Sequence, residues 1–160
     1  MFRKLWKSFE TTALHAASVG AQIYVEWPRH CAYWKMPKVR NFLTQLEFKD
    51  AIFDGCMYGL TASHGPNIGI RMKKPWRIAC LNSCLPDSLN KVCSGDHPHT
   101  WCQGQDTVLT QQYTPEIAKI IVESVRLSVT RDARGGKCAS EVIKDDNSSA
   151  YVANIVDVST

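Results

Sequence analysis

Ten consecutive residues, "CSGDHPHTWC" from Cys93 to Cys102, combine two cysteines with two histidines. Thiolates and imidazoles are ligands that zinc prefers in proteins, and a structural zinc site takes four of them. Cys93, His97, His99 and Cys102 supply that number within a single loop. We therefore predict a candidate metal site at these four residues, with zinc as the metal it could hold. Their spacing, C-x3-H-x-H-x2-C, differs from that of the familiar zinc fingers and ribbons.

Two alternatives to a metal site stay open for this loop at the level of the sequence. The residues could be buried thiols and surface histidines without a metal, because buried cysteine is common in folded proteins. A cysteine beside a histidine could instead be a catalytic pair oriented by Asp96, which would indicate a thiol-dependent hydrolase. If a metal is bound, Cys80 or Cys84 could also replace one of the four ligands. No G-x-S-x-G, H-E-x-x-H or phosphate-loop pattern points to another enzyme class.

The composition of the chain is that of a globular protein. Apolar residues make up 44% of its 160 residues and charged residues 21%, which is enough for one domain with a core. The seven cysteines are an odd number, and charges interrupt the first residues where a signal peptide needs an apolar run. No stretch is long and apolar enough to span a membrane. We therefore expect an intracellular protein, cytoplasmic or nuclear, that is not secreted and has no membrane partner.

The net charge of +4 permits an anionic partner such as nucleic acid. Basic residues stand beside aromatic ones in "RKLWK" (3–7) and "RMKKPWR" (71–77), and Trp34 could add a surface for stacking on bases. The residues predicted to contact nucleic acid are Arg29, Lys73, Lys74, Trp76 and Arg77. The alternative is a solvated basic face next to half-buried tryptophans.

The first half of the chain alternates between helix and strand patterns. Apolar residues spaced three and four apart predict an amphipathic helix over 2–18 and a second one over 36–46. The run "AQIYVEW" (21–27), stopped by Pro28, predicts a buried strand, and the short apolar run 50–54 predicts another. Because helices and strands alternate here, we expect a parallel sheet with crossover helices.

The second half contributes one more strand and two helices. "KKPWRIACL" (73–81) predicts a strand beside the second one, a short helix is expected at 87–92, and a longer one at 114–129. The segment 131–160 is polar and lacks sustained periodicity, which predicts a loosely ordered tail in which 151–158 could add an edge strand.

Three motifs follow one another in an order that resembles a known family: "YVEWP" (24–28), "FDGCMYG" (53–59) and "KKPWRIACL" (73–81), followed by the Cys/His cluster. This order is similar to that of methyltransferase-like domains in retroelement polyproteins, and it resembles the C-terminal half of the DNA cytosine-C5 methyltransferase fold. The resemblance covers about three quarters of the chain. It implies a partial Rossmann-like methyltransferase fold over 1–130, an α/β domain with a small, mainly parallel sheet and flanking helices.

Within this resemblance, Glu26 stands where the family has the glutamate that contacts a flipped target base. A carboxylic acid at that place can protonate the ring nitrogen of the base, so the resemblance implies a vestigial catalytic role for Glu26. Trp27 stands where the enzymes usually have asparagine. The alternative is that Glu26 is a strand-end carboxylate that caps the next loop or pairs with Arg29.

Two motifs of the enzyme family are missing before Glu26. The glycine-rich turn that binds S-adenosylmethionine and the Pro-Cys nucleophile loop both precede this part of the family's fold, whereas one predicted helix precedes Glu26 here. We therefore predict a truncated or degenerate retroelement-derived methyltransferase-like domain, ancestrally directed at nucleic acid and inactive in isolation. It would bind S-adenosylmethionine only if an upstream half exists. The alternative function is a non-enzymatic nucleic-acid or protein-interaction module with a zinc-stabilised Cys/His loop.

Overall fold

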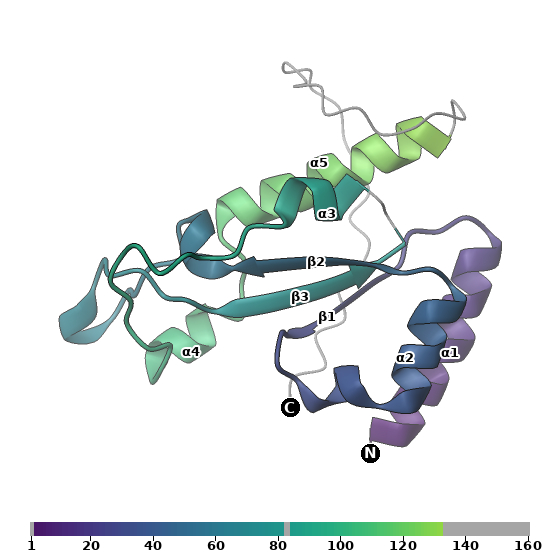
Figure 1. The fold of residues 1–160 in the computed structure, drawn as a ribbon, viewed down its shortest axis with the longest axis horizontal. Coiled ribbons are helices and arrows are strands. Elements are labelled where there is room, and N and C mark those ends of the chain that lie inside the picture. The colour runs from purple at the N-terminus through teal and green to yellow at the C-terminus, as the bar shows by residue number, and fades with distance from the viewer. Residues whose placement is uncertain (1, 82–83, 133–160) are drawn as a thin grey trace.

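Three strands pair into one sheet in the computed structural model, which describes residues 2–81 and 84–132 (Figure 1). The strands β1 (Tyr24–Pro28), β2 (Lys49–Asp54) and β3 (Pro75–Cys80) lie in the order β1-β3-β2. The α-helices are α1 (Phe2–Ser18), α2 (Pro37–Gln45), α3 (Cys84–Leu89), α4 (Gln105–Leu109) and α5 (Pro115–Asp132). The short 3-10 helices are η1 (Ala32–Lys35), η2 (Gly55–Tyr58) and η3 (Gly65–Asn67).

The expected mainly parallel, Rossmann-like sheet is wrong, because both strand pairs of the described sheet are antiparallel. The crossover through α2 does make β1 and β2 run in the same direction, since each is antiparallel to β3. A crossover fixes the relative direction of two strands but does not make them neighbours. β3 occupies the centre because it is buried on both faces, with Ile78, Ala79 and Cys80 all excluded from solvent.

Most predicted elements are present near their expected positions. α1, α2 and α5 closely follow the predicted helices, and β3 pairs with β2 as expected. The short helix predicted at 87–92 lies earlier in the chain, at α3, and α4 was not predicted. Apart from the last two residues of α5, the predicted tail 131–160 with its edge strand lies outside the described residues. Within the described ranges, no helix combines the length and apolar character needed to cross a membrane.

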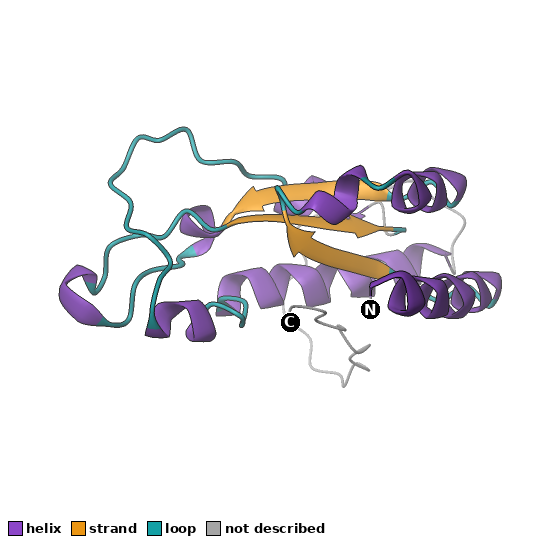
Figure 2. Ribbon diagram, turned by 90° about the horizontal axis from the view of Figure 1, so that it is seen from below, coloured by secondary structure: helices purple, strands orange, loops and turns teal. Residues whose placement is uncertain are grey.

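The first core lies between one face of the sheet and a layer formed by α3 and α5 (Figure 1). Phe53 of β2 and Trp76 and Ile78 of β3 project into this core, where Leu89 of α3 and Ile117 of α5 contact them. Burying an apolar side chain of this size contributes roughly 1.5–3 kcal/mol. α5 runs along the sheet (Figure 2), so this layer fixes the position of β3 and of the loops at its ends.

The second core lies on the opposite face, where α1, η1 and α2 cover β1. It is rich in aromatic side chains: the rings of Trp27 and Trp34 are 4.6 Å apart in a T-shaped arrangement, and those of Trp6 and Phe42 are 5.7 Å apart. Ala79 of β3 completes the contact with the sheet. This packing holds η1 against the sheet.

Candidate metal centre

The end of β2 places Cys56 in the interior. The strand stops at Asp54, and η2 turns Cys56 inward, where 2% of its surface is exposed. Gly55 is required at this turn, because a Cβ there would lie 2.6 Å from Leu60 Cδ2 and 2.9 Å from Trp76 Cζ3. This close approach fixes the position of Cys56 relative to the sheet.

The loop 91–102 is tied to the rest of the protein near both of its ends. Near its start, the amide of Cys93 donates a hydrogen bond to Oδ2 of Asp54 over 2.9 Å. Near its end, the amide of Thr100 donates to the carbonyl of Arg71, also over 2.9 Å. These two attachments bring the side chains of the loop to the end of the sheet where β2 stops.

Two thiols and two imidazoles converge at this end of the sheet. Ligand atoms of Cys56, Cys93, His97 and His99 all lie within 4.8 Å of one another. Cys93 Sγ is 3.6 Å from Nε2 of His97 and 3.5 Å from Nε2 of His99. Both cysteines are buried and both histidines half-buried. This cluster of soft donor atoms could hold a metal ion that is largely shielded from solvent.

The cluster contains three of the four predicted ligands and replaces the fourth. Cys102 lies elsewhere, with its Sγ 3.0 Å from Oγ1 of Thr110, and Cys56 takes its place. Neither alternative ligand considered from the sequence, Cys80 or Cys84, belongs to this cluster, and Cys80 hydrogen-bonds the carbonyl of Lys49. Sequence reasoning missed Cys56 because the whole of β3 separates it from the loop. The available signal was a cysteine directly after a strand, in "FDGCMYG".

The surroundings of the cluster shift the pKa values of two of its members, Cys56 and His99. Burial, a hydrogen bond to the Cys93 thiol and the charge of Asp54 raise the pKa of Cys56 to about 12. Burial and the neighbouring charge of His97 lower the pKa of His99, so this imidazole is neutral at about pH 7. A metal ion supplies the positive charge that a thiolate needs at such a place, and it binds an imidazole in its neutral form.

Asp96 orients the ring of His97. Its Oδ1 lies 2.7 Å from Nδ1 of His97, and this contact lowers the pKa of Asp96. Because an ionised carboxylate only accepts hydrogen bonds, Nδ1 of His97 carries a proton toward Asp96, and a metal would bind the ring through Nε2. The lone pair of Nε2 then faces Cys93 and the cluster. Carboxylates commonly hold metal-binding histidines in this way.

The donor set is thus defined by residues from two segments of the chain, η2 and the loop 91–102, that lie far apart in sequence. Comparison with family models, curated proteins and solved structures finds no match. These comparisons therefore supply no function for the cluster, and the residues around it have to indicate one.

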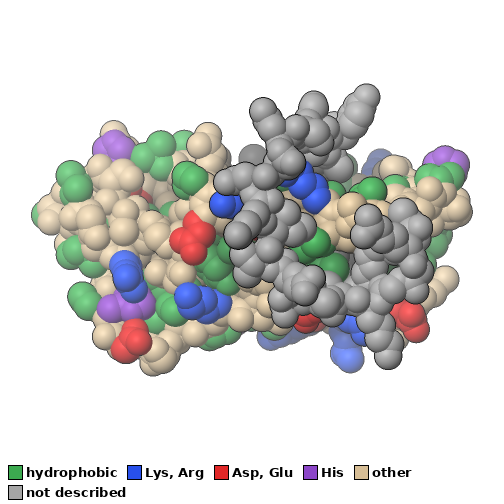
Figure 3. Space-filling model, turned by 90° about the horizontal axis from the view of Figure 1, so that it is seen from above, with side chains coloured by type: hydrophobic (Ala, Val, Ile, Leu, Met, Phe, Trp, Pro, Cys, Tyr) green, Lys and Arg blue, Asp and Glu red, His purple; other side chains and the backbone are tan. Residues whose placement is uncertain are grey.

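An exposed tryptophan and basic side chains surround the cluster. Trp101 is 83% exposed, and the preceding residue, Thr100, pairs with the segment that carries Arg71. Arg71 and Lys73 are exposed, and Nη1 of Arg71 lies 3.3 Å from Nδ1 of His97. Figure 3 shows basic side chains beside a histidine at the left end of the displayed face. The cluster is therefore bordered by groups that can contact an anionic, aromatic partner.

The five predicted nucleic-acid contacts lie in three different places. Lys73 is at the exposed end just described. Lys74 lies with its Nζ 4.9 Å from the ring of Trp76, and Trp76 is buried in the first core, where its ring cannot stack on a base. Arg29 and Arg77 lie together on the other face of the sheet, where they line a pocket. The structure therefore does not bring these five side chains into one surface.

Glu26 lies on the opposite face of the sheet from Arg77. It is paired in register with Ile78, whose side chain belongs to the first core, whereas the next residue, Trp27, belongs to the second. Because successive side chains of a strand alternate between faces, Glu26 points to the α3–α5 side. The structure therefore separates Glu26 from both Arg29 and Arg77.

Proposed function

We propose that the chain is a non-enzymatic nucleic-acid-binding module in which a structural zinc ion holds the loop 91–102. The observation that carries this proposal is the convergence of Cys56, Cys93, His97 and His99 at the end of the sheet. Structural zinc sites are closed by four protein ligands, whereas catalytic sites keep one position open for water or substrate. A complete set of four ligands therefore favours a structural ion.

The spacing of the ligand atoms supports zinc in particular. In tetrahedral sites zinc lies about 2.3 Å from sulfur and about 2.0–2.1 Å from nitrogen, which separates these two ligands by roughly 3.6 Å. The distances from Cys93 Sγ to Nε2 of His97 and of His99 are 3.6 and 3.5 Å. These three side chains therefore need little movement to bind zinc.

The surface beside the loop supports a nucleic acid as the partner. Trp101 presents an exposed ring, and stacking of a base on such a ring contributes about 1–3 kcal/mol. Arg71 and Lys73 are exposed beside it and can neutralise phosphates. Because the bases of a single strand are free to stack on a protein ring, we infer that the preferred partner is single-stranded.

A thiol-dependent hydrolase is the second candidate, because Cys93, His97 and Asp96 follow one another at 3.6 and 2.7 Å as in a catalytic triad. A triad gives no role to Cys56 and His99, although both belong to the same cluster. Cys93 is also only 6% exposed, which restricts access of a substrate to its sulfur. Treatment with iodoacetamide separates the two candidates: zinc-bound thiolates are protected from alkylation, whereas a catalytic thiol reacts first.

The truncated methyltransferase-like domain stays a prediction from the order of its motifs. Its expected sheet is wrong, and Glu26 faces the α3–α5 layer. Calorimetric titration of the purified chain with S-adenosylmethionine tests the predicted inactivity. We expect no binding, and saturable binding would contradict both the prediction of an inactive domain and the non-enzymatic module proposed here.

The zinc ion is tested by measuring the metal content of the purified chain with mass spectrometry. We expect one zinc per chain, retained in Cys102→Ser and lost in Cys56→Ser. Cys102 is the matched control because it is a cysteine at the border of the same loop with its sulfur outside the cluster. Retention of zinc in Cys56→Ser together with its loss in Cys102→Ser would contradict the proposed ligand set.

Nucleic-acid binding is tested by fluorescence anisotropy with a labelled single-stranded oligonucleotide. We expect Trp101→Ala to weaken binding by roughly tenfold, because a stacking contact is lost, and Trp101→Phe to restore most of the affinity. Val129→Ala, which shortens an exposed apolar side chain of α5, is the control and should change nothing. A zinc-loaded chain that shows no saturable binding would overturn the nucleic-acid part of the proposal.

A further inference from the structure

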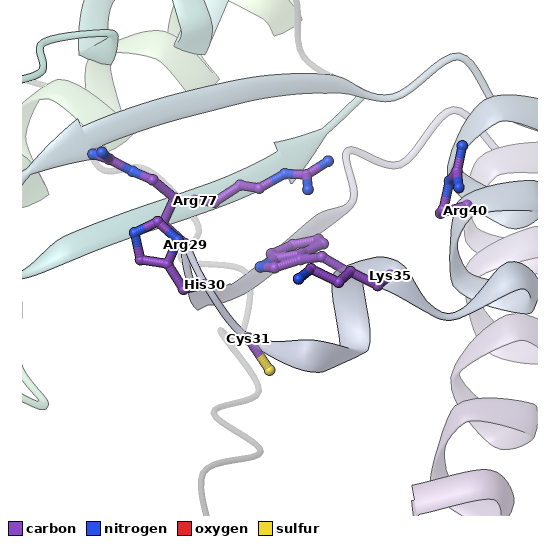
Figure 4. Close-up of a pocket in the computed structure, with 7 residues that line it drawn as sticks. Arg29, His30, Cys31, Lys35, Arg40 and Arg77 are labelled. Atoms are coloured by element: carbon purple, nitrogen blue, oxygen red, sulfur yellow. The ribbon is translucent and has the colours of Figure 1, made fainter.

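A pocket of about 330 Å³ lies on the side of the sheet that carries the second core. Its walls hold four cationic side chains: Arg29 after β1, Lys35 of η1, Arg40 of α2 and Arg77 of β3. In Figure 4 the side chains of Lys35, Arg40 and Arg77 come from different segments of the chain toward one space beside Trp34, whereas the guanidinium of Arg29 points away from that space. No carboxylate is among the residues that line it. The folded chain therefore concentrates positive charge around a cavity.

Two of these cations are held in place by carboxylates that lie outside the pocket lining. Nη2 of Arg29 donates to Oδ1 of Asp54 over 2.6 Å, and Asp54 is fully buried. Arg77 binds Asp50 with two hydrogen bonds, of 2.8 and 2.9 Å. The paired contact holds the guanidinium of Arg77 in a defined orientation, so that its remaining donor is pre-positioned for a ligand.

Trp34 forms a rigid part of the wall. Its indole Nε1 donates to the carbonyl of Pro28 over 3.0 Å, and the residue is 5% exposed. The guanidinium carbon of Arg77 lies 4.2 Å from the centre of this ring. Because Arg77 and Trp27 already pack against the ring, Trp34 orients a cation and does not offer a free face to a base.

The charge of the pocket matches a doubly negative group. Asp54 and Asp50 offset two of the four cations, which leaves an excess of two positive charges, on Lys35 and Arg40. A phosphate monoester carries nearly two negative charges at neutral pH, because its second pKa is about 6. Arg77 uses its Nε and Nη2 for Asp50, so its Nη1 is left as a donor beside Lys35 and Arg40. The site therefore has both the charge and the donors for a phosphate.

We propose that this pocket binds the phosphate group of a small phosphate monoester. Its volume lies at the lower end of the range for small-molecule sites, about 300–1,000 Å³, so a phosphate with a modest organic group fits it. Guanidinium groups bind phosphate with paired hydrogen bonds, and the exposed Lys35 and Arg40 can close on the ligand from the solvent side. This site is separate from the zinc cluster and from Trp101.

Isothermal titration calorimetry of the full chain with adenosine 5′-monophosphate, inorganic phosphate and adenosine tests this site. We expect the first two to bind and adenosine not to bind, since the phosphate supplies the recognition. The difference in affinity between adenosine 5′-monophosphate and inorganic phosphate measures how much the organic group contributes to binding. The variant Lys35→Gln/Arg40→Gln should bind adenosine 5′-monophosphate at least about tenfold more weakly. Both residues are exposed, so this variant should fold normally, which circular dichroism checks.

Lys119→Gln is the matched control, because it removes one exposed cation from α5, on the other side of the sheet. It should leave the affinity unchanged within about twofold. Cys31, which also lines the pocket, gives an independent readout. Its alkylation by iodoacetamide should slow by roughly tenfold when the ligand is held at about ten times its Kd, whereas that of Cys102 should not change.

Three outcomes would overturn the proposal: no saturable binding up to about 10 mM adenosine 5′-monophosphate, equal affinity for adenosine, or wild-type affinity in the folded double variant. These measurements depend neither on the zinc content of the chain nor on its affinity for an oligonucleotide. The phosphate pocket and the zinc-stabilised module can therefore fail independently of each other.

Discussion

The amide of Cys93 donates a hydrogen bond to the carboxylate of Asp54, which is fully buried at the end of β2. The other oxygen of the same carboxylate pairs with Arg29, at the wall of the phosphate pocket. One buried side chain thus joins the loop of the candidate metal centre to a pocket on the far side of β2. Removing the charge of Asp54 is therefore expected to affect both the loop and the pocket.

Asp54→Asn should therefore lower the free energy of unfolding by about 2–4 kcal/mol, because it leaves the Arg29 guanidinium without its buried counter-charge. Urea unfolding followed by tryptophan fluorescence measures the change. Asp50→Asn is the control, since its carboxylate is 38% exposed and should cost about 1 kcal/mol or less. Equal losses of unfolding free energy in the two variants would show that the buried ion pair contributes no more to stability than the exposed one.

Gly55→Ala should destabilise the protein by about 1–3 kcal/mol, because the added Cβ would collide with Leu60 and Trp76. The same change should reduce the zinc content, since Gly55 positions Cys56. In the double variant Gly55→Ala/Leu60→Ala the nearest clash is removed, so the total loss should be smaller than the sum of the two single losses. Additive losses in urea unfolding would speak against a steric cause.

Zinc should be retained at about pH 7 and released as the pH falls through roughly 6 to 4, because protons compete for thiolates and imidazoles. The lowered pKa of His99 works in favour of the metal, since this ring takes up a proton only below the usual range of histidine. A chromogenic chelator added along a pH series measures the release. If the metal were held by surface carboxylates instead, Cys56→Ser would leave this release curve unchanged.

Binding of a single-stranded oligonucleotide should weaken as salt is added, and Arg71→Gln should make this dependence shallower. Each lost phosphate contact reduces the slope of log affinity against log salt by about 0.7 for single strands. Anisotropy titrations at several salt concentrations measure the slope. Lys119→Gln, which removes a cation from α5, should leave it unchanged; a similar decrease in both variants would indicate a general charge effect without a defined site.

Local patterns in the sequence were sufficient to predict α1, α2, α5 and the three strands of the described sheet, although they missed α4 and misplaced α3. The spacing of apolar residues in α1 and α2, and the short runs of β2 and β3, depend on neighbouring positions alone. For the same reason, three of the four cluster members, Cys93, His97 and His99, could be recognised as a group. Their proximity follows from the few residues between them.

Only the tertiary structure decided the order of the strands, the fourth member of the cluster and the phosphate pocket. β3 lies between β1 and β2 because it is buried on both faces, a property of the packed molecule that no local pattern encodes. The chain after α3 lies beside β2, where Phe53 pairs with Lys91, and this contact brings the following loop to Cys56. The central position of β3 places Arg77 next to β1, on the face away from Trp76. Contacts between distant segments depend on which faces are buried together, and that is fixed when the chain packs.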